Sequence, residues 1–108
     1  MLYDERFSDA ELGKIIEEGM IYMCACPAQV AEAMRTLRAL HRYQLNCLTQ
    51  PQNDATVHST IAESTVIAHA TLQDCLDRVL DLENWDRATL TMPPNLRVRQ
   101  LGAMLEDD

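Results

Sequence analysis

The feature that most constrains this chain is a run of about 30 residues, Asp54 to Trp85, that contains neither glycine nor proline. Apolar residues recur in it at intervals of three and four, and the alternation typical of a strand is absent. The run therefore predicts one long helix, with Asn53 or Asp54 as its N-cap. Its expected core stripe is Val57, Ile61, Ala68, Leu72, Cys75, Val79 and Leu82, widened by Leu76 and Leu80.

Two shorter helices are predicted before it. In "FSDAEL", Ser8 and Glu11 form a capping box and Phe7 can pack on Leu12, which predicts a helix over 9–23. Its apolar face comprises Leu12, Ile15, Ile16, Met20 and Met23. Pro27 suits a first helical turn and disfavours helical geometry at Cys26, so Cys26 is expected to cap a second helix that reaches about Leu48. Its apolar positions are Val30, Ala33, Met34, Leu37, Leu40, His41, Leu45 and Leu48.

These elements predict an all-α fold, a small up-down-up bundle of three helices in which the two long ones form an antiparallel hairpin. The hairpin turn is "TQPQND". Residues 1–86 are expected to form the bundle domain, and residues 87–108 an extended arm that docks on its own chain or on a neighbour. Since 108 residues enclose only one small core, dimerisation is the expected way to complete it.

The charge and the amino terminus limit the partners. The formal net charge of −8 opposes binding to nucleic acid and to anionic lipid surfaces. The terminus "MLYDERFSDAELGK" is acidic where a signal peptide is basic, and no segment has the roughly 18 consecutive apolar residues of a membrane span. We therefore expect a cytosolic protein without a nucleic-acid or membrane partner. In that compartment its four cysteines are buried apolar residues, metal ligands or redox thiols rather than disulfides.

The antiparallel hairpin brings two cysteines to the same height. Cys26 and Cys75 are level with each other, and Cys24 lies two residues from Cys26. An N-capping thiolate is favoured by the helix dipole, so these three residues are a candidate redox trio or a site for a soft transition metal such as zinc or copper. The alternative is that they only fill space and cap the helix.

A second, weaker cluster is predicted at the other end of the hairpin. Cys47 and His58 are level there, with His41 as a third candidate ligand. His41 lies about 9 Å along the axis from Cys47 and about 120° around it, so these two need a further helix to share a metal. As a residue within an apolar stripe, His41 is otherwise a hydrogen-bonded core histidine.

Charged and apolar stripes suggest an interface. Arginines and aspartates follow the same i, i+3, i+7 spacing on the second and third helices, and they lie at different heights in the hairpin. They are therefore expected to meet between chains or to bind a partner protein, unless both faces are simply solvated. An incompletely covered apolar patch is expected at the end of the third helix. The interface candidates are Arg35, Arg38, Arg42, Asp74, Asp77, Asp81, Leu76, Leu80 and Trp85.

The sequence contains no Ser-His-Asp order, Gly-rich phosphate loop or zinc-protease motif that would name a reaction. It predicts a small cytosolic helical protein–protein interaction module rather than an enzyme. We expect the module to self-associate as a homodimer or to bind a partner protein, and a regulatory role is one of the functions that this would allow. The alternative is a metal-binding or thiol-redox protein that uses the cysteine corner between the first two helices.

Overall fold

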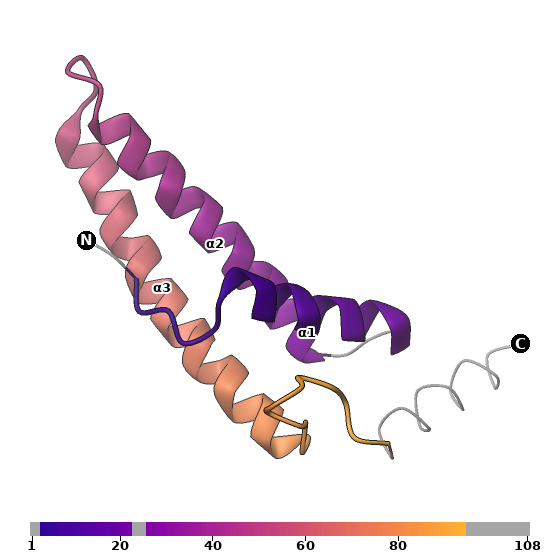
Figure 1. Cartoon of the computed structure of the whole chain (residues 1–108). Coiled ribbons are helices and arrows are strands. Elements are labelled where there is room, and N and C mark those ends of the chain that lie inside the picture. The colour runs from indigo at the N-terminus through magenta and orange to yellow at the C-terminus, as the bar shows by residue number, and fades with distance from the viewer. Residues whose placement is uncertain (1–2, 23–25, 95–108) are drawn as a thin grey trace, which may run out of the picture.

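The computed structural model of the chain confirms the all-α prediction (Figure 1). It describes residues 3–22 and 26–94. Three helices follow one another: α1 at Asp9–Tyr22, α2 at Cys26–Leu48 and α3 at Ala55–Leu82. Helices α2 and α3 form the long antiparallel hairpin, and α1 packs against the amino-terminal half of α2. Helix α1 thus covers only one end of the hairpin. At the turn end, α2 and α3 pack on each other alone.

Two of the predicted helix starts are confirmed by side-chain caps. Ser8 and Glu11 make reciprocal hydrogen bonds. The Glu11 N–H donates to Ser8 Oγ at 3.1 Å, and the Ser8 N–H donates to Glu11 Oε1 at 2.9 Å. Asp54 rather than Asn53 caps α3, because its Oδ1 accepts from the amides of Thr56 and Val57 at 2.9 and 3.3 Å. Asn53 instead donates to the Cys47 carbonyl and closes the turn.

Replacement of Asp54 by alanine is expected to lower the free energy of unfolding by about 1 kcal/mol, because two amides of the first turn lose their acceptor. Urea unfolding followed by circular dichroism measures the change. Asp54→Ser keeps an oxygen at the cap and should recover most of the loss. Equal losses in the two variants would show that the cap does not contribute.

The carboxyl end of α3 lies three residues earlier than the predicted Trp85. Asn84 adopts the left-handed conformation, with φ of 59°. The Trp85 N–H then bonds the Leu80 carbonyl at 3.0 Å and the Asn84 N–H bonds the Asp81 carbonyl at 3.1 Å, which is a Schellman motif. This reversal turns the chain back, so that Trp85 packs into the core beside Leu80.

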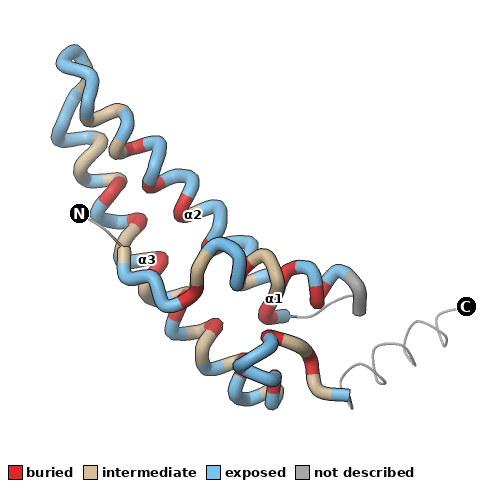
Figure 2. Tube along the Cα trace, viewed as in Figure 1, coloured by how far each residue is buried: buried red, intermediate tan, exposed pale blue. Residues whose placement is uncertain are grey.

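The apolar core lies where α1 crosses the hairpin. Its members come from α1 with Phe7, from the first turns of α2, and from the last turns of α3 with the segment after it: Phe7, Leu12, Ile15, Ile16, Ala31, Met34, Leu76, Leu80, Trp85, Leu90 and Met92. On α1 and α2, three of the described core positions that we predicted are exposed: Met20 at 77%, Leu40 at 38% and Ala33. Figure 2 shows the turn end of the hairpin as exposed or intermediate, whereas buried residues recur from there to the crossing of α1.

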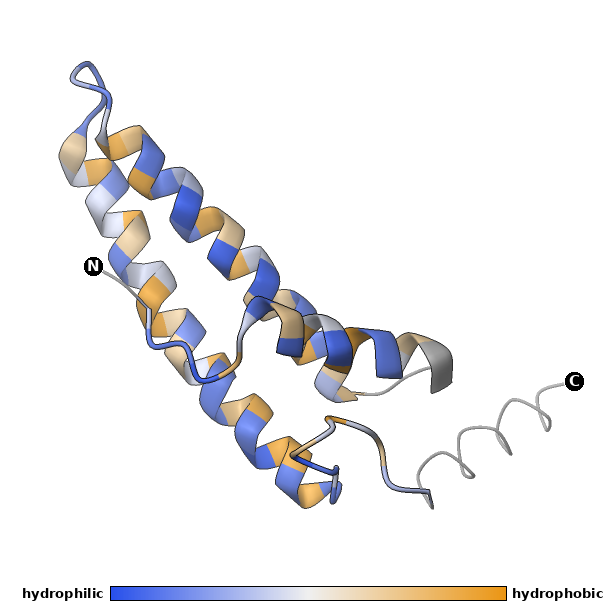
Figure 3. Ribbon diagram, in the orientation of Figure 1, coloured by the Kyte–Doolittle hydropathy of each residue, from blue (hydrophilic) through white to orange (hydrophobic). Residues whose placement is uncertain are grey.

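Polar residues fill the middle of the hairpin, so its buried seam differs from the predicted one. On α3 the buried residues are Ala62, Thr65, His69, Gln73, Leu76 and Leu80. The predicted stripe lies mostly one residue away from this seam; its members Ile61, Ala68, Leu72, Cys75 and Val79 are only partly buried, and Val57 and Leu82 are exposed. Hydrophilic segments accordingly interrupt the hydrophobic ones along both long helices in Figure 3. The most apolar side of α3 is therefore not the side that packs on α2.

The first residues of the predicted arm dock on their own chain. Leu90 and Met92 are buried in the core, and the Met92 N–H donates to Glu18 Oε1 of α1 at 2.9 Å. Residues 95–108 lie outside the described residues. Leu76, Leu80 and Trp85, which we expected to form an uncovered patch, are therefore buried beneath this segment and α1 instead of lying at an interface.

Candidate interaction surfaces

One side of the hairpin carries no charge. Helices α2 and α3 contain nine Asp, Glu and Arg residues, and at 3.6 residues per turn none of them lies on the half of either helix that turns away from α1; Arg78 lies at its rim. The residues of that half that lie outside the buried seam are partly buried or exposed. We call it the charge-free face, and its larger apolar members are Leu37, Leu40, Val57, Ile61, Ala68, Leu72, Cys75, Val79 and Leu82.

The opposite side of the hairpin is covered. The amino-terminal segment crosses α3 and α1 crosses α2 on this side (Figure 1). Contacts from this side reach Arg38, Gln73, Asp74 and Asp77. Among the described residues, these contacts of α1 and the amino-terminal segment lie on the covered side and not on the charge-free face.

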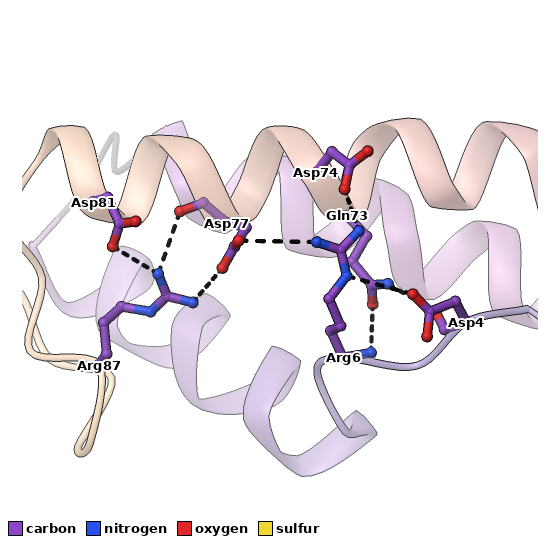
Figure 4. A network of polar contacts seen from close by, with 7 residues as sticks. All are labelled: Asp4, Arg6, Gln73, Asp74, Asp77, Asp81 and Arg87. Carbon is purple, nitrogen blue, oxygen red and sulfur yellow. Dashed lines mark hydrogen bonds and ion pairs between the residues drawn. The ribbon is translucent and has the colours of Figure 1, made fainter.

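The acidic stripe of α3 binds arginines of its own chain. Figure 4 shows Arg6 and Arg87 approaching this stripe from the two ends of the described chain. Arg6 pairs with Asp74 and reaches Asp77 at 3.8 Å, whereas Arg87 pairs with Asp77 at 2.5 Å and with Asp81 at 2.7 Å. These aspartates therefore hold the segments before α1 and after α3, in place of the expected arginines of another chain.

Arg38 is buried, and so it does not form an exposed stripe with Arg35 and Arg42. Its side chain is 1% exposed, and its guanidinium donates to three groups: His69 Nε2 at 3.0 Å, Asp9 Oδ1 at 2.7 Å and the Phe7 carbonyl at 2.6 Å. Arg38 thus ties α2 to α3 and to the start of α1. The same contact lowers the pKa of Asp9, because the guanidinium hydrogen bond stabilises the carboxylate.

Arg35 and Arg42 remain exposed and line a groove of about 750 Å³ between α1 and α2. Asp9 and Glu32 also line it, so the groove carries both signs of charge. Because acidic and basic side chains line the groove together, it favours neither anions nor cations as ligands.

His69 sits at the centre of the buried polar seam. It is 1% exposed, and its Nε2 accepts from Arg38, so the neutral ring carries its proton on Nδ1. That Nδ1 is buried and makes no hydrogen bond within the described part of the chain. Burial, and next the charge of Arg38, lower the pKa of His69. Protonation at Nε2 would remove the acceptor of Arg38 and place two cations side by side.

This arrangement predicts acid sensitivity. Because the pKa of His69 is lower in the folded chain than the usual unfolded value near 6.5, the unfolded chain binds more protons as pH falls below that value. Stability is then fully present above about pH 6.5 and falls below it, by at most about 1.4 kcal/mol per pH unit from this one group. Urea unfolding at pH 7.5 and 5.5 should show a larger loss for the wild type than for His69→Gln. Equal losses would exclude His69 as the cause.

The amino-terminal segment covers this seam. Residues 3–6, which we call the strap, lie across α3 in Figure 1. The Tyr3 ring centroid lies 4.5 Å from that of His69 and 5.3 Å from that of His41, and the Arg38 guanidinium carbon is 5.2 Å from the Tyr3 centroid. The Gln73 amide accepts from Arg6 N–H at 2.9 Å and donates to the Asp4 carbonyl at 2.8 Å.

The predicted metal or thiol sites are not assembled by the described residues. No group of three His, Cys, Asp or Glu side chains that could hold a metal is present among them. Cys24 lies outside the described residues, Cys26 is exposed, and Cys47 and Cys75 are partly buried free thiols. In the second cluster, His58 Nδ1 bonds Gln44 Oε1 at 2.7 Å and His41 packs on Tyr3.

No family model, curated protein or solved structure matches this chain. The function is therefore inferred from the surfaces above. Among the described helices, none combines the length and the apolar character that crossing a membrane requires.

Sequence reasoning did not find the strap or the residues of α2 and α3 that it contacts. Tyr3, Arg6 and Gln73 carry no motif, and polar residues at core positions are not recognised by a search for apolar periodicity. The available signal was the spacing of His69, Gln73, Leu76 and Leu80, which continues one helical face across polar and apolar residues.

Proposed function

We propose that this protein is a self-associating helical interaction module, in which two hairpins pack through their charge-free faces into a four-helix bundle. The observation that carries the proposal is the complete segregation of charge on α2 and α3. In a chain with 24% charged residues, a helical face of this length without charge is typical of a surface that is buried by another protein.

The spacing of the face supports packing by another helix. On α3 it follows a three–four repeat through Ile61, Ala68, Leu72, Cys75 and Val79, beside the seam that packs on α2. Two neighbouring seams on one helix are what a helix with two helical neighbours requires. The chain supplies one of these neighbours, α2, and the proposed partner supplies the other.

The size of the face suits a stable interface. From Val57 to Leu82 α3 is roughly 37 Å long, and two packed helices are roughly 20 Å wide. Their product is roughly 700 Å² per partner, close to the area of about 800 Å² per partner found in standard interfaces.

The lack of charge on this face allows a second copy to be the partner. Two copies that each carry a net charge of −8 repel one another wherever their charged sides approach. The charge-free face lets them meet with the aspartates and arginines of both copies on the outside. A symmetric contact of identical faces is also the commonest form of self-association. The cytosolic location inferred from the sequence stays a prediction and accompanies this proposal.

Sedimentation equilibrium of the full chain at about 1–100 μM tests the proposal. Reversible monomer–dimer behaviour with a dissociation constant in or below this range is expected, and it should persist in high salt because the contact is apolar. A monomer across the whole range would contradict it. Loss of the dimer in salt alone would indicate that a charged surface forms the contact.

A further inference from the structure

We infer that the strap occupies a recognition site for an extended peptide, and that it is the built-in, displaceable occupant of that site. The ligand is a segment of a partner protein with an aromatic residue and, three positions later, an arginine, as Tyr3 and Arg6 present in the strap. The site lies on the covered side of the hairpin, so it is independent of the charge-free face.

Gln73 recognises the backbone of an extended segment. It is fully buried, and its one amide group bonds both the carbonyl of Asp4 and the N–H of Arg6. A neighbouring strand would make the same pair of bonds to residues i and i+2. Since both partners are main-chain atoms, any extended segment can make these bonds. The fixed position of a buried side chain keeps this group ready for a ligand.

Two side-chain positions supply selectivity. The aromatic ring rests against His69 and His41 with Arg38 near its face, an arrangement that favours a ring over an aliphatic side chain. Three residues later the arginine meets Asp74 and Asp77 of α3. Between them, Asp4 and Glu5 are exposed. Asp4 pairs with Arg6 at 3.5 Å and Glu5 pairs with Arg38 at 3.8 Å, and such exposed ion pairs add little selectivity.

The contacts between the strap and the hairpin are weak enough for the strap to dissociate from it. No described strap residue belongs to a helix, and Asp4, Glu5 and Arg6 are exposed. Ion pairs between partly exposed side chains each contribute at most about 1 kcal/mol. Phe7, which is buried in the core and bonded through its carbonyl to Arg38, stays in place as the anchor. Opening of the strap therefore leaves the three helices packed, and it requires less free energy than global unfolding.

One donor in the site is left for a ligand. Nδ1 of His69 is buried and has no hydrogen-bond partner within the described residues, although Tyr3 lies against the same ring. The strap thus leaves one polar group of the site unsatisfied. A partner segment that brings an acceptor to Nδ1 gains a bond that the strap does not make.

A peptide competition experiment tests the inference. The probe is a fluorescein-labelled peptide of residues 3–8, and fluorescence anisotropy measures its binding to the full chain. In the wild type the tethered strap competes at an effective concentration in the millimolar range, so binding is weak. In full-length Tyr3→Ala/Arg6→Ala the peptide is expected to bind at least tenfold more tightly. Adding Gln73→Leu to that variant should remove the gain.

Three controls decide the interpretation. A peptide with alanine in place of its tyrosine should lose the gain, and the same affinity for both peptides would overturn the inference. Ala68→Glu, which disrupts the proposed dimer but none of the strap contacts, should leave peptide binding within about threefold, so failure of either proposal is recognised separately. Loss of the dimer in Tyr3→Ala/Arg6→Ala would instead show that the strap exchanges between copies, and would overturn a site for partner segments.

Hydrogen exchange on the wild-type chain tests displaceability even if the strap variant fails to fold. The Arg6 amide, bonded to Gln73, is expected to exchange at least tenfold faster than the slowest amides of α3 under native conditions. Exchange of the Arg6 amide only with the slowest α3 amides would mean that the strap leaves only on global unfolding, and the inference would be wrong.

Discussion

Replacement of Arg38 by methionine is expected to lower the free energy of unfolding by about 3–5 kcal/mol, the loss typical of breaking a buried charged network. The variant leaves the Phe7 carbonyl and His69 Nε2 without their donor, and both groups lie in buried surroundings. Each unsatisfied buried polar group costs about 1–3 kcal/mol. The exposed Asp9 contributes little to this loss, because water screens its pairing with the guanidinium.

Arg42→Met is the matched control for this prediction. Arg42 lies one turn further along α2 and is exposed, so the same substitution should change stability by no more than about 0.5 kcal/mol. Urea unfolding of the wild type and both variants measures the difference. Similar values for the two variants would show that the Arg38 network does not stabilise the fold, and that the arginines of α2 are equivalent, as their spacing alone suggests.

Replacement of Ala68 by glutamate is expected to weaken dimerisation by roughly 100-fold or more, which corresponds to about 3 kcal/mol. Ala68 lies near the middle of the charge-free face, so a dimer would bury two new carboxylates without partners. The fold of one chain should tolerate the change, because Ala68 is only partly buried and glutamate is a good helix former. Sedimentation equilibrium gives the dissociation constant, and circular dichroism checks the helix content.

Ile67→Glu introduces the same charge one residue away. Ile67 is 69% exposed and lies outside the charge-free face, on the outer side of α3. Its substitution should change the dissociation constant by no more than about threefold. If Ile67→Glu dissociates the dimer and Ala68→Glu does not, the interface lies on the outer side of the hairpin and the proposed surface is wrong.

Asp77 links the two ends of the described chain. It pairs with Arg6 of the strap and with Arg87 of the segment after α3, at distances of 3.8 and 2.5 Å. In the proposed peptide site, the arginine of a partner segment would therefore lie beside the Arg87–Asp77 contact, which helps to hold the segment after α3. The acidic stripe thus gives this side of the hairpin a role in chain docking. On the charge-free face, Leu72 and Val79 border the core of the described chain and remain partly exposed.

The sequence by itself determined the helices and their starts. Ser8 with Glu11, Pro27 and Asp54 act through contacts with residues at most four positions away, so their effect is readable locally. The antiparallel hairpin followed from the length of the two periodic segments and the short break between them. The bundle class was therefore predictable from residues that interact with their sequence neighbours.

Only the tertiary structure decided which side of each helix is buried and by what. The side of α3 with His69 and Gln73 is enclosed because groups about 30 and 70 residues away, Arg38 and the strap backbone, satisfy those polar atoms. Apolar periodicity indicated instead the side with Ala68 and Leu72, which the described chain leaves partly open. Hydrophobicity shows that a surface prefers burial, but it does not specify whether the chain itself or a second molecule covers it.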